Sequence, residues 1–132
     1  MDIGDQVLDA LLLHRLDEFA ALRDPPRTFC IDGYEEQRIA KLIERAARSR
    51  SDIVAAASCP PTSFVVIWIG APVRMNDREF QVRSRYHTGP TNGEEGLFTL
   101  TSSGDRWKVT KYVTSWVSRS DSHFKRANAE SR

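Results

Sequence analysis

The 132-residue chain lacks several features that would assign it to a class of proteins at once. Its only two cysteines, Cys30 and Cys59, have no CxxC spacing and no accompanying histidine cluster, so a zinc site is not expected. No apolar run approaches the roughly 20 residues that span a bilayer, and the N-terminus is acidic, unlike a secretory signal. We therefore expect a cytoplasmic protein without membrane association. We expect both thiols to be reduced, although the sequence leaves open whether they pair.

The sequence also lacks the short motifs that identify common reactions. It contains no GxGxxG, no Walker-type loop, no HExxH and no GxSxG, and its three histidines are widely scattered. We therefore expect no cofactor and no metal, and regard an enzyme as the weaker hypothesis. The net charge of +1 gives no global reason to expect nucleic acid as a partner.

Charge is nevertheless uneven along the chain. Residues 1–60 carry eight basic and eleven acidic side chains, whereas residues 61–132 carry eleven and seven. The balances of −3 and +4 could steer a charged partner towards one side of the molecule. Ordinary variation among solvated residues is the simpler interpretation, and it is the one we favour.

The first half of the chain shows helical periodicity. Apolar residues recur every three or four positions over residues 3–22, which predicts an amphipathic helix. A brief strand is expected over residues 27–31. Asp32 and Glu35 then have the spacing of a capping box and predict the start of a second helix. The alanine-rich segment 53–58 favours a further short helix.

The second half has the alternation of β-strands. The predicted strands cover residues 64–69, 79–88, 96–102 and 106–117, with a short continuation of the first over 73–75. The first is uninterruptedly apolar, so we expect it to be covered on both faces. A shift in the alternation of the last predicts a bulge near Lys111. We expect one domain over residues 1–117 and a frayed polar tail over 118–132.

These elements predict an α+β fold in which the N-terminal helices pack on a curved antiparallel meander. The order of elements over residues 34–117, and the ending GDRWKVTKYVTSW over residues 104–116, resemble the cystatin-like superfold and its NTF2-like proteins. The resemblance implies helices on the concave side of the sheet. It also implies a wide choice of functions, because this group includes isomerase-like and dehydratase-like enzymes, ligand-binding proteins, interaction modules and bacterial immunity proteins.

His87, Tyr86 and Asp32 are the candidates for catalysis. A pocket enzyme of the isomerase or dehydratase type would need a base and a proton donor that converge on the substrate. Adjacent strand residues face opposite ways, so Tyr86 and His87 share a pocket only if the strand bulges. We therefore favour a structural histidine over a catalytic one.

A basic row and an acidic turn are the candidates for binding a partner. Arg83, Arg85 and His87 are spaced two apart and project from one face of a strand, where arginine could meet carboxylates. Glu94 and Glu95 follow Asn92-Gly93, which we expect to form a loop with positive φ. The alternative for both features is an ordinary solvated surface.

Without a catalytic constellation, these features favour a non-catalytic module that binds a protein partner, such as an immunity-type protein that neutralises its partner. A homodimer is plausible. The competing hypothesis is a small-molecule binder or isomerase/dehydratase-like enzyme whose aromatic-lined pocket lies between the helices and the sheet. A third hypothesis, nucleic-acid binding through Arg83 and Arg85, is the weakest.

Overall fold

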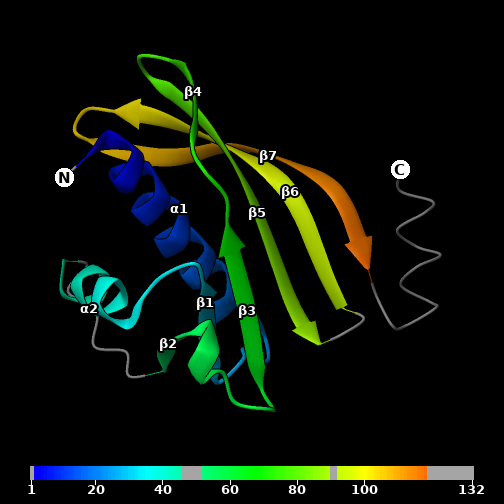
Figure 1. Cartoon of the computed structure of the whole chain (residues 1–132). Coiled ribbons are helices and arrows are strands. Elements are labelled where there is room, and N and C mark those ends of the chain that lie inside the picture. Colours follow the sequence, from blue (N-terminus) through cyan, green and yellow to red (C-terminus); the bar gives the residue numbers. More distant parts are fainter. Residues whose placement is uncertain (1, 46–51, 90–91, 119–132) are drawn as a thin grey trace.

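The computed structural model describes residues 2–45, 52–89 and 92–118 (Figure 1). The elements follow the order α1 (Ile3–Ala20), β1 (Thr28–Asp32), α2 (Glu36–Arg45), β2 (Ile53–Ala55), the 3₁₀ helix η1 (Ala56–Ser58), β3 (Phe64–Ile69), β4 (Val73–Asn76), β5 (Glu79–Gly89), β6 (Asn92–Ser103) and β7 (Arg106–Ser118). The predicted α+β class is therefore confirmed. The predicted tail lies, apart from Ser118, outside the described residues.

The sheet is mixed rather than purely antiparallel. Its strand order is β2-β1-β3-β5-β6-β7, with β4 pairing with β5 beyond the end of β3. The antiparallel meander is confirmed from β3 to β7. It is wrong for β1 and β2, because β1 runs parallel to both β2 and β3. A parallel pair needs a long crossover, and α2 provides that crossover between β1 and β2.

Helix α1 lies against the concave side of the curved sheet (Figure 1). We call the sheet face towards α1 the inner face and the opposite face the outer face. Two buried clusters join the helix to the sheet. One cluster gathers Leu12, Leu16, Phe19, Phe29, Ile31, Tyr34, Ile39, Leu42, Ile53, Val65 and Ile67. The other gathers Val7, Leu11, Phe80, Val82, Phe98 and Leu100. The predicted amphipathic helix over 3–22 is thus confirmed, although it ends at Ala20.

Two predictions for the segments that follow α1 are wrong. Asp32 does not cap the second helix, because it is the last residue of β1 and α2 begins at Glu36. The positive φ of Gly33, 91°, lets the chain turn between the two elements. The alanine-rich segment 53–58 forms β2 and the 3₁₀ helix η1 instead of an α-helix. Pairing with β1 outweighs its helical propensity.

Strand β3 lies in the middle of the sheet but is not covered on both faces as predicted. Val65 and Ile67 are buried on the inner face, whereas Phe64, Val66 and Trp68 keep intermediate exposure. Burial therefore alternates along the strand. The apolar outer side chains are a surface feature rather than part of the core.

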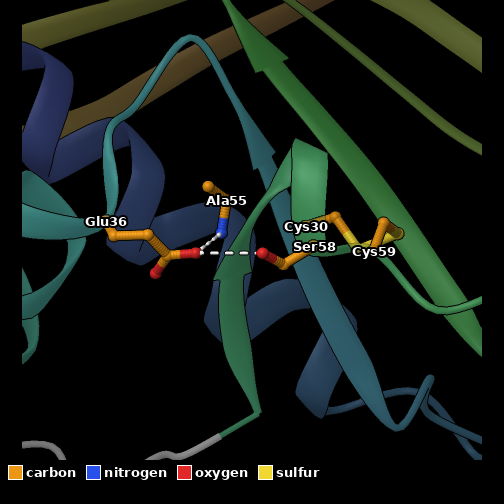
Figure 2. The surroundings of a disulfide bond; sticks show 5 residues. All are labelled: Cys30, Glu36, Ala55, Ser58 and Cys59. Carbon is orange, nitrogen blue, oxygen red and sulfur yellow. Dashed lines mark hydrogen bonds between the residues drawn. A yellow bond between two sulfur atoms is a disulfide. The ribbon is translucent and has the colours of Figure 1, made fainter.

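A disulfide joins Cys30 to Cys59, so the expectation of two reduced thiols is wrong (Figure 2). Cys30 is fully buried in β1, and Cys59 follows η1, which folds back over that strand. Glu36 holds the same segment from α2, because its Oε1 accepts hydrogen bonds from the backbone N–H of Ala55 (3.1 Å) and the hydroxyl of Ser58 (3.4 Å). The β2–η1 segment is thus fixed both covalently and by hydrogen bonds.

Strands β5, β6 and β7 form the long antiparallel part of the sheet. A two-residue turn joins β6 to β7, and its first residue, Gly104, has a φ of 67°. Asn92 and Gly93 do not form the predicted loop with positive φ, because β6 begins at Asn92. Glu94 and Glu95 consequently lie in a strand rather than at a loop tip.

Strand β7 contains two irregularities. Its register against β6 shifts at Thr110 and again at Ser115, so each of these residues is extra relative to its partner strand. The first shift confirms the bulge predicted near Lys111. The two shifts determine which side chains of β7 reach each face of the sheet.

Candidate functional site

A pocket of about 530 Å³ lies on the inner face, between the C-terminal half of α1 and the strands. We call it the Arg15–Glu94 pocket. It is lined by Arg15, Glu18, Phe19, Leu22, Asp24, Pro25, Pro26, Ser63, Phe64, Tyr86, Thr88, Glu94 and Tyr112. Its size lies within the usual range for small-molecule sites. Aromatic walls and a few polar side chains are typical of such sites.

Arg15 is the charged residue of this pocket that lies deepest. It is 2% exposed, because its position on α1 belongs to the apolar stripe that packs on the sheet. Its Nη1 donates to Glu18 Oε1 at 2.9 Å. The Nε atom is buried and has no hydrogen-bond partner among the described residues. A buried donor left unpaired costs free energy, and such groups are uncommon outside functional sites.

Three aromatic rings surround the Arg15 guanidinium. Its central carbon lies 5.1 Å from the ring centroid of Phe19, 5.2 Å from that of Tyr86 and 5.0 Å from that of Phe98. Ring faces attract cations, so the aromatic wall helps to offset the cost of burying this charge. One wall of the pocket is therefore a protein cation held by rings and a carboxylate.

Glu94 organises the opposite side of the pocket. Its Oε2 accepts hydrogen bonds from the hydroxyls of Tyr112 (2.5 Å) and Thr114 (3.1 Å). Its Oε1 accepts a longer bond of 3.5 Å from the hydroxyl of Tyr86. Each tyrosine or threonine comes from a strand next to β6, so the pairing of β5, β6 and β7 sets this geometry.

Tyr112 can reach Glu94 because Gly96 lies beneath its ring. A Cβ atom on Gly96 would come within 2.3 Å of the Tyr112 ring. The ring also packs on Phe98, with centroids 4.4 Å apart. Burial, and then the hydrogen bond to Glu94, raises the pKa of Tyr112 far above its ordinary value. The phenol therefore stays protonated and donates to the carboxylate.

The predicted basic row lies on the outer face, away from this pocket. Arg83 Nη1 contacts Glu95 Oε2 at 3.5 Å, and Arg85 Nη1 contacts Glu95 Oε1 at 3.7 Å. The Arg85 guanidinium also stacks 4.5 Å above the Trp68 ring. Glu94 and Glu95, predicted to act together, point to opposite faces because they are adjacent in a strand.

The three candidate catalytic residues do not converge. Tyr86 faces the pocket, whereas His87 is exposed on the outer face beside Val66. Asp32 is exposed and lies on β1, where it pairs with Trp68 along the edge of β3 that is opposite to β5. The alternation of strand side chains separates them, as the prediction for Tyr86 and His87 anticipated.

Sequence reasoning missed Arg15 and Glu18 as site residues, and it named Tyr112 only among the tyrosines that could assist a catalytic residue. A signal for Arg15 was present, because an arginine interrupts the apolar stripe of the first helix between Leu11 and Phe19. No comparable signal exists for Tyr112. Its face depends on the bulge at Thr110 and on contact with Gly96 across the strands.

No protein-family model, curated protein or solved structure matches this chain. Within the described ranges, no group of three or more His, Cys, Asp and Glu side chains is placed to hold a metal ion. Neither helix of the described part combines the length and apolar character needed to cross a membrane. The proposals that follow therefore rest on the geometry of the site.

Proposed function

We propose that the protein binds a small organic ligand in the Arg15–Glu94 pocket. The observation that carries this proposal is a pocket of about 530 Å³ whose wall contains a buried arginine with an unpartnered Nε. Opposite it, Glu94 is held by three hydroxyl groups. Fixed polar groups among aromatic walls can orient a ligand without reorganising.

Binding is favoured over catalysis because the polar groups of the pocket bond to one another. The phenol of Tyr112 is committed to Glu94, and the guanidinium of Arg15 to Glu18. The two candidates for acid–base chemistry on β5, Tyr86 and His87, lie on opposite faces of the sheet. Only Tyr86 of this pair therefore lines the cavity, whereas acid–base catalysis by both residues would need them to converge there.

A blocked pocket tests this proposal. A fragment library is screened by ligand-observed NMR against the natural protein and two variants. Leu22→Trp places a large ring at the rim of the pocket, and Val73→Trp adds the same ring to another exposed aliphatic position, on β4. Leu22→Trp should weaken bound fragments at least tenfold, whereas Val73→Trp should leave them unchanged. A screen without hits, or hits unaffected by Leu22→Trp, would overturn the proposal.

A second candidate function is partner binding through the outer face, the role first expected for this chain. We define the outer-face patch as Trp68, Arg83, Arg85, Val113 and Trp116. Val113 and Trp116 are 51% and 42% exposed, large fractions for apolar side chains. Tryptophan and arginine are enriched among the residues that dominate binding at protein interfaces. Nearby Lys108 and Lys111 are exposed on β7, which favours a partner with an acidic surface.

Purification of the tagged protein from its native source tests this second function. The natural protein should retain a stoichiometric acidic partner, and the double variant Arg83→Glu/Trp116→Ala should lose it. Val73→Ala, which trims an exposed residue outside the patch, is the control. Self-association seen by sedimentation and abolished by the double variant would instead assign the patch to a homodimer.

The position of α1 in the concave side of the sheet supports a distant relationship with the cystatin-like and NTF2-like group. The parallel strands β1 and β2 are the main departure from the meander expected for it. The disulfide is an argument against the proposed cytoplasmic location, because such bonds persist chiefly in oxidising compartments. Alkylation and mass spectrometry of the natively expressed protein would identify the thiol state and so test the location.

A further inference from the structure

The Arg15–Glu94 pocket contains more acidic than basic side chains. Glu18, Asp24 and Glu94 face a single cation, Arg15, whose charge Glu18 already engages at 2.9 Å. An anionic ligand would therefore meet a surplus of negative charge. A cation would be attracted to the same surplus, and most strongly where solvent is excluded.

Although the buried Nε of Arg15 is a donor without a partner among the described residues, the carboxylate of Glu94 keeps capacity to accept a hydrogen bond from a ligand. The hydroxyls of Tyr86, Tyr112 and Thr114 all donate to Glu94. Oε2 of this carboxylate receives two of these bonds, whereas within the described part of the chain Oε1 receives only the long one from Tyr86, at 3.5 Å. A carboxylate oxygen accepts about two hydrogen bonds, so Oε1 keeps capacity for a donor supplied by a ligand.

The aromatic walls also favour a cation. Phe19, Phe64, Tyr86 and Tyr112 line the cavity. The neighbouring Arg15 shows the same chemistry within the protein, because its guanidinium lies about 5 Å from three ring centroids with a carboxylate beside it. A ligand cation near Glu94 would meet an equivalent combination of ring faces and negative charge.

We propose that the ligand of this pocket is an organic cation, a protonated amine or amidine joined to a flat apolar body. Glu94 Oε1 accepts a hydrogen bond from the cationic group, and the aromatic walls contact the apolar body. This inference rests on the proposed ligand-binding function and names the chemical class of its ligand.

Three probes of nearly equal shape test the charge preference. Benzamidine is a cation, benzamide is neutral and benzoate is an anion, and each is titrated by calorimetry and by protein-observed NMR. Benzamidine should bind at least tenfold more tightly than the other two. Raising the salt concentration should weaken benzamidine alone, because its attraction to the carboxylates is partly screened.

Two glutamate variants locate the interaction. Glu94→Gln should reduce benzamidine affinity at least tenfold and leave benzamide unaffected. Glu95→Gln removes the same charge from the adjacent residue, whose side chain lies on the outer face, and should change nothing. Thermal unfolding of both variants verifies that they fold. If Glu94→Gln does not fold, Asp24→Asn, at the exposed side of the pocket, provides the second measurement and should weaken benzamidine at least twofold.

The outcomes separate this inference from the function on which it rests. Three outcomes would overturn the proposal of a cationic ligand and leave the proposal of a ligand pocket intact. These are equal binding of all three probes, tighter binding of benzoate, and benzamidine binding that neither pocket variant changes. The proposal of a cationic ligand would also be wrong if fragments bind the pocket and benzamidine does not. A fragment screen without hits, or hits unaffected by Leu22→Trp, would instead remove the pocket function itself.

Discussion

Strands β2, β1 and β3 are short and parallel, and a disulfide ties the middle one, β1, to the segment that follows η1. Strands β5, β6 and β7 run for 11 to 13 residues, pair antiparallel and carry Tyr86, Glu94 and Tyr112 of the pocket. The first half of the sheet is held mainly by burial and a covalent bond. The second half holds its side chains through strand pairing and hydrogen bonds. The half that contains the disulfide can thus support a site that is built mainly on the other half, as binding sites often require.

The largest expected effect tests the covalent half. Replacing both cysteines, Cys30→Ala with Cys59→Ser, should lower the free energy of unfolding by about 3–4 kcal/mol. The disulfide joins residues 29 positions apart, and closing a loop of that length lowers the entropy of the unfolded chain. Urea unfolding followed by circular dichroism measures the change. Ser58→Ala, which removes only the hydroxyl beside the bridge, is the control and should cost far less. A double variant as stable as the natural protein would contradict this division of the sheet.

The next effect tests the antiparallel half. Gly96→Ala should lower the free energy of unfolding by about 1–3 kcal/mol, because the added methyl collides with the Tyr112 ring. The displaced phenol should also lose its bond to Glu94, so pocket fragments should bind more weakly. Combining Gly96→Ala with Tyr112→Ser makes room for the methyl. An unchanged cost in that double variant would show that the collision is not its cause.

A smaller effect compares two phenols that donate to carboxylates, the buried Tyr34 and the partly exposed Tyr112. Burial, and then the carboxylate of Asp9, raises the pKa of Tyr34 far above its ordinary value, as burial and Glu94 do for Tyr112. Since both folded pKa values exceed the unfolded value near 10, their stabilising effect is complete below pH ~10 and is lost at higher pH. Tyr34→Phe should cost about 1 kcal/mol at neutral pH through the lost bond to Asp9.

Spectrophotometric titration of the phenols provides the measurement. The natural protein should show delayed ionisation accompanied by alkaline unfolding above pH ~10. Tyr34→Phe and Tyr112→Phe should each remove one delayed phenol and reduce the slope of stability against pH. Phenols that all titrate near pH 10 while the protein stays folded would contradict both assignments.

The smallest effect on stability is expected on the outer face. Trp116→Ala should change the free energy of unfolding by no more than about 0.5 kcal/mol, because Trp116 is 42% exposed and belongs to neither buried cluster. The same substitution should reduce partner binding strongly if the outer-face patch is an interface. Chemical denaturation measures the first quantity and the partner's dissociation constant the second. A large loss of stability would assign Trp116 to the structure rather than to binding.

Local patterns predicted much of the fold. The periodicity of residues 3–22 and the alternation from Glu79 to Thr88 located α1 and β5, since each pattern reports the face that the element itself buries. The parallel pairing of β1 could not be predicted in this way, because a five-residue strand does not indicate its neighbours. For the same reason, the alanines after Ile53 indicated a helix where pairing with β1 produces a strand.

The candidate site was less predictable than the fold. The sequence pointed to Arg83, Arg85 and His87, which do share a face, and it included Glu94 for a different reason, as part of a loop. The pocket depends on contacts between distant segments, such as Tyr112 with Glu94 and Arg15 with Tyr86. These contacts result from strand register, and no spacing along the chain encodes them.

The two bulges of β7 have a consequence for comparing this chain with future relatives. With a regular register at Thr110, Tyr112 would face outwards, and with one at Ser115, Trp116 would lie opposite Glu94. Each extra residue therefore changes the phase of every side chain after it. A homologue that lacks one of these extra residues could keep the later side chains on the same faces of the sheet. Only an alignment with a one-residue gap at that position would show the correspondence. Insertions and deletions at these two positions would then trace the history of the pocket better than substitutions do.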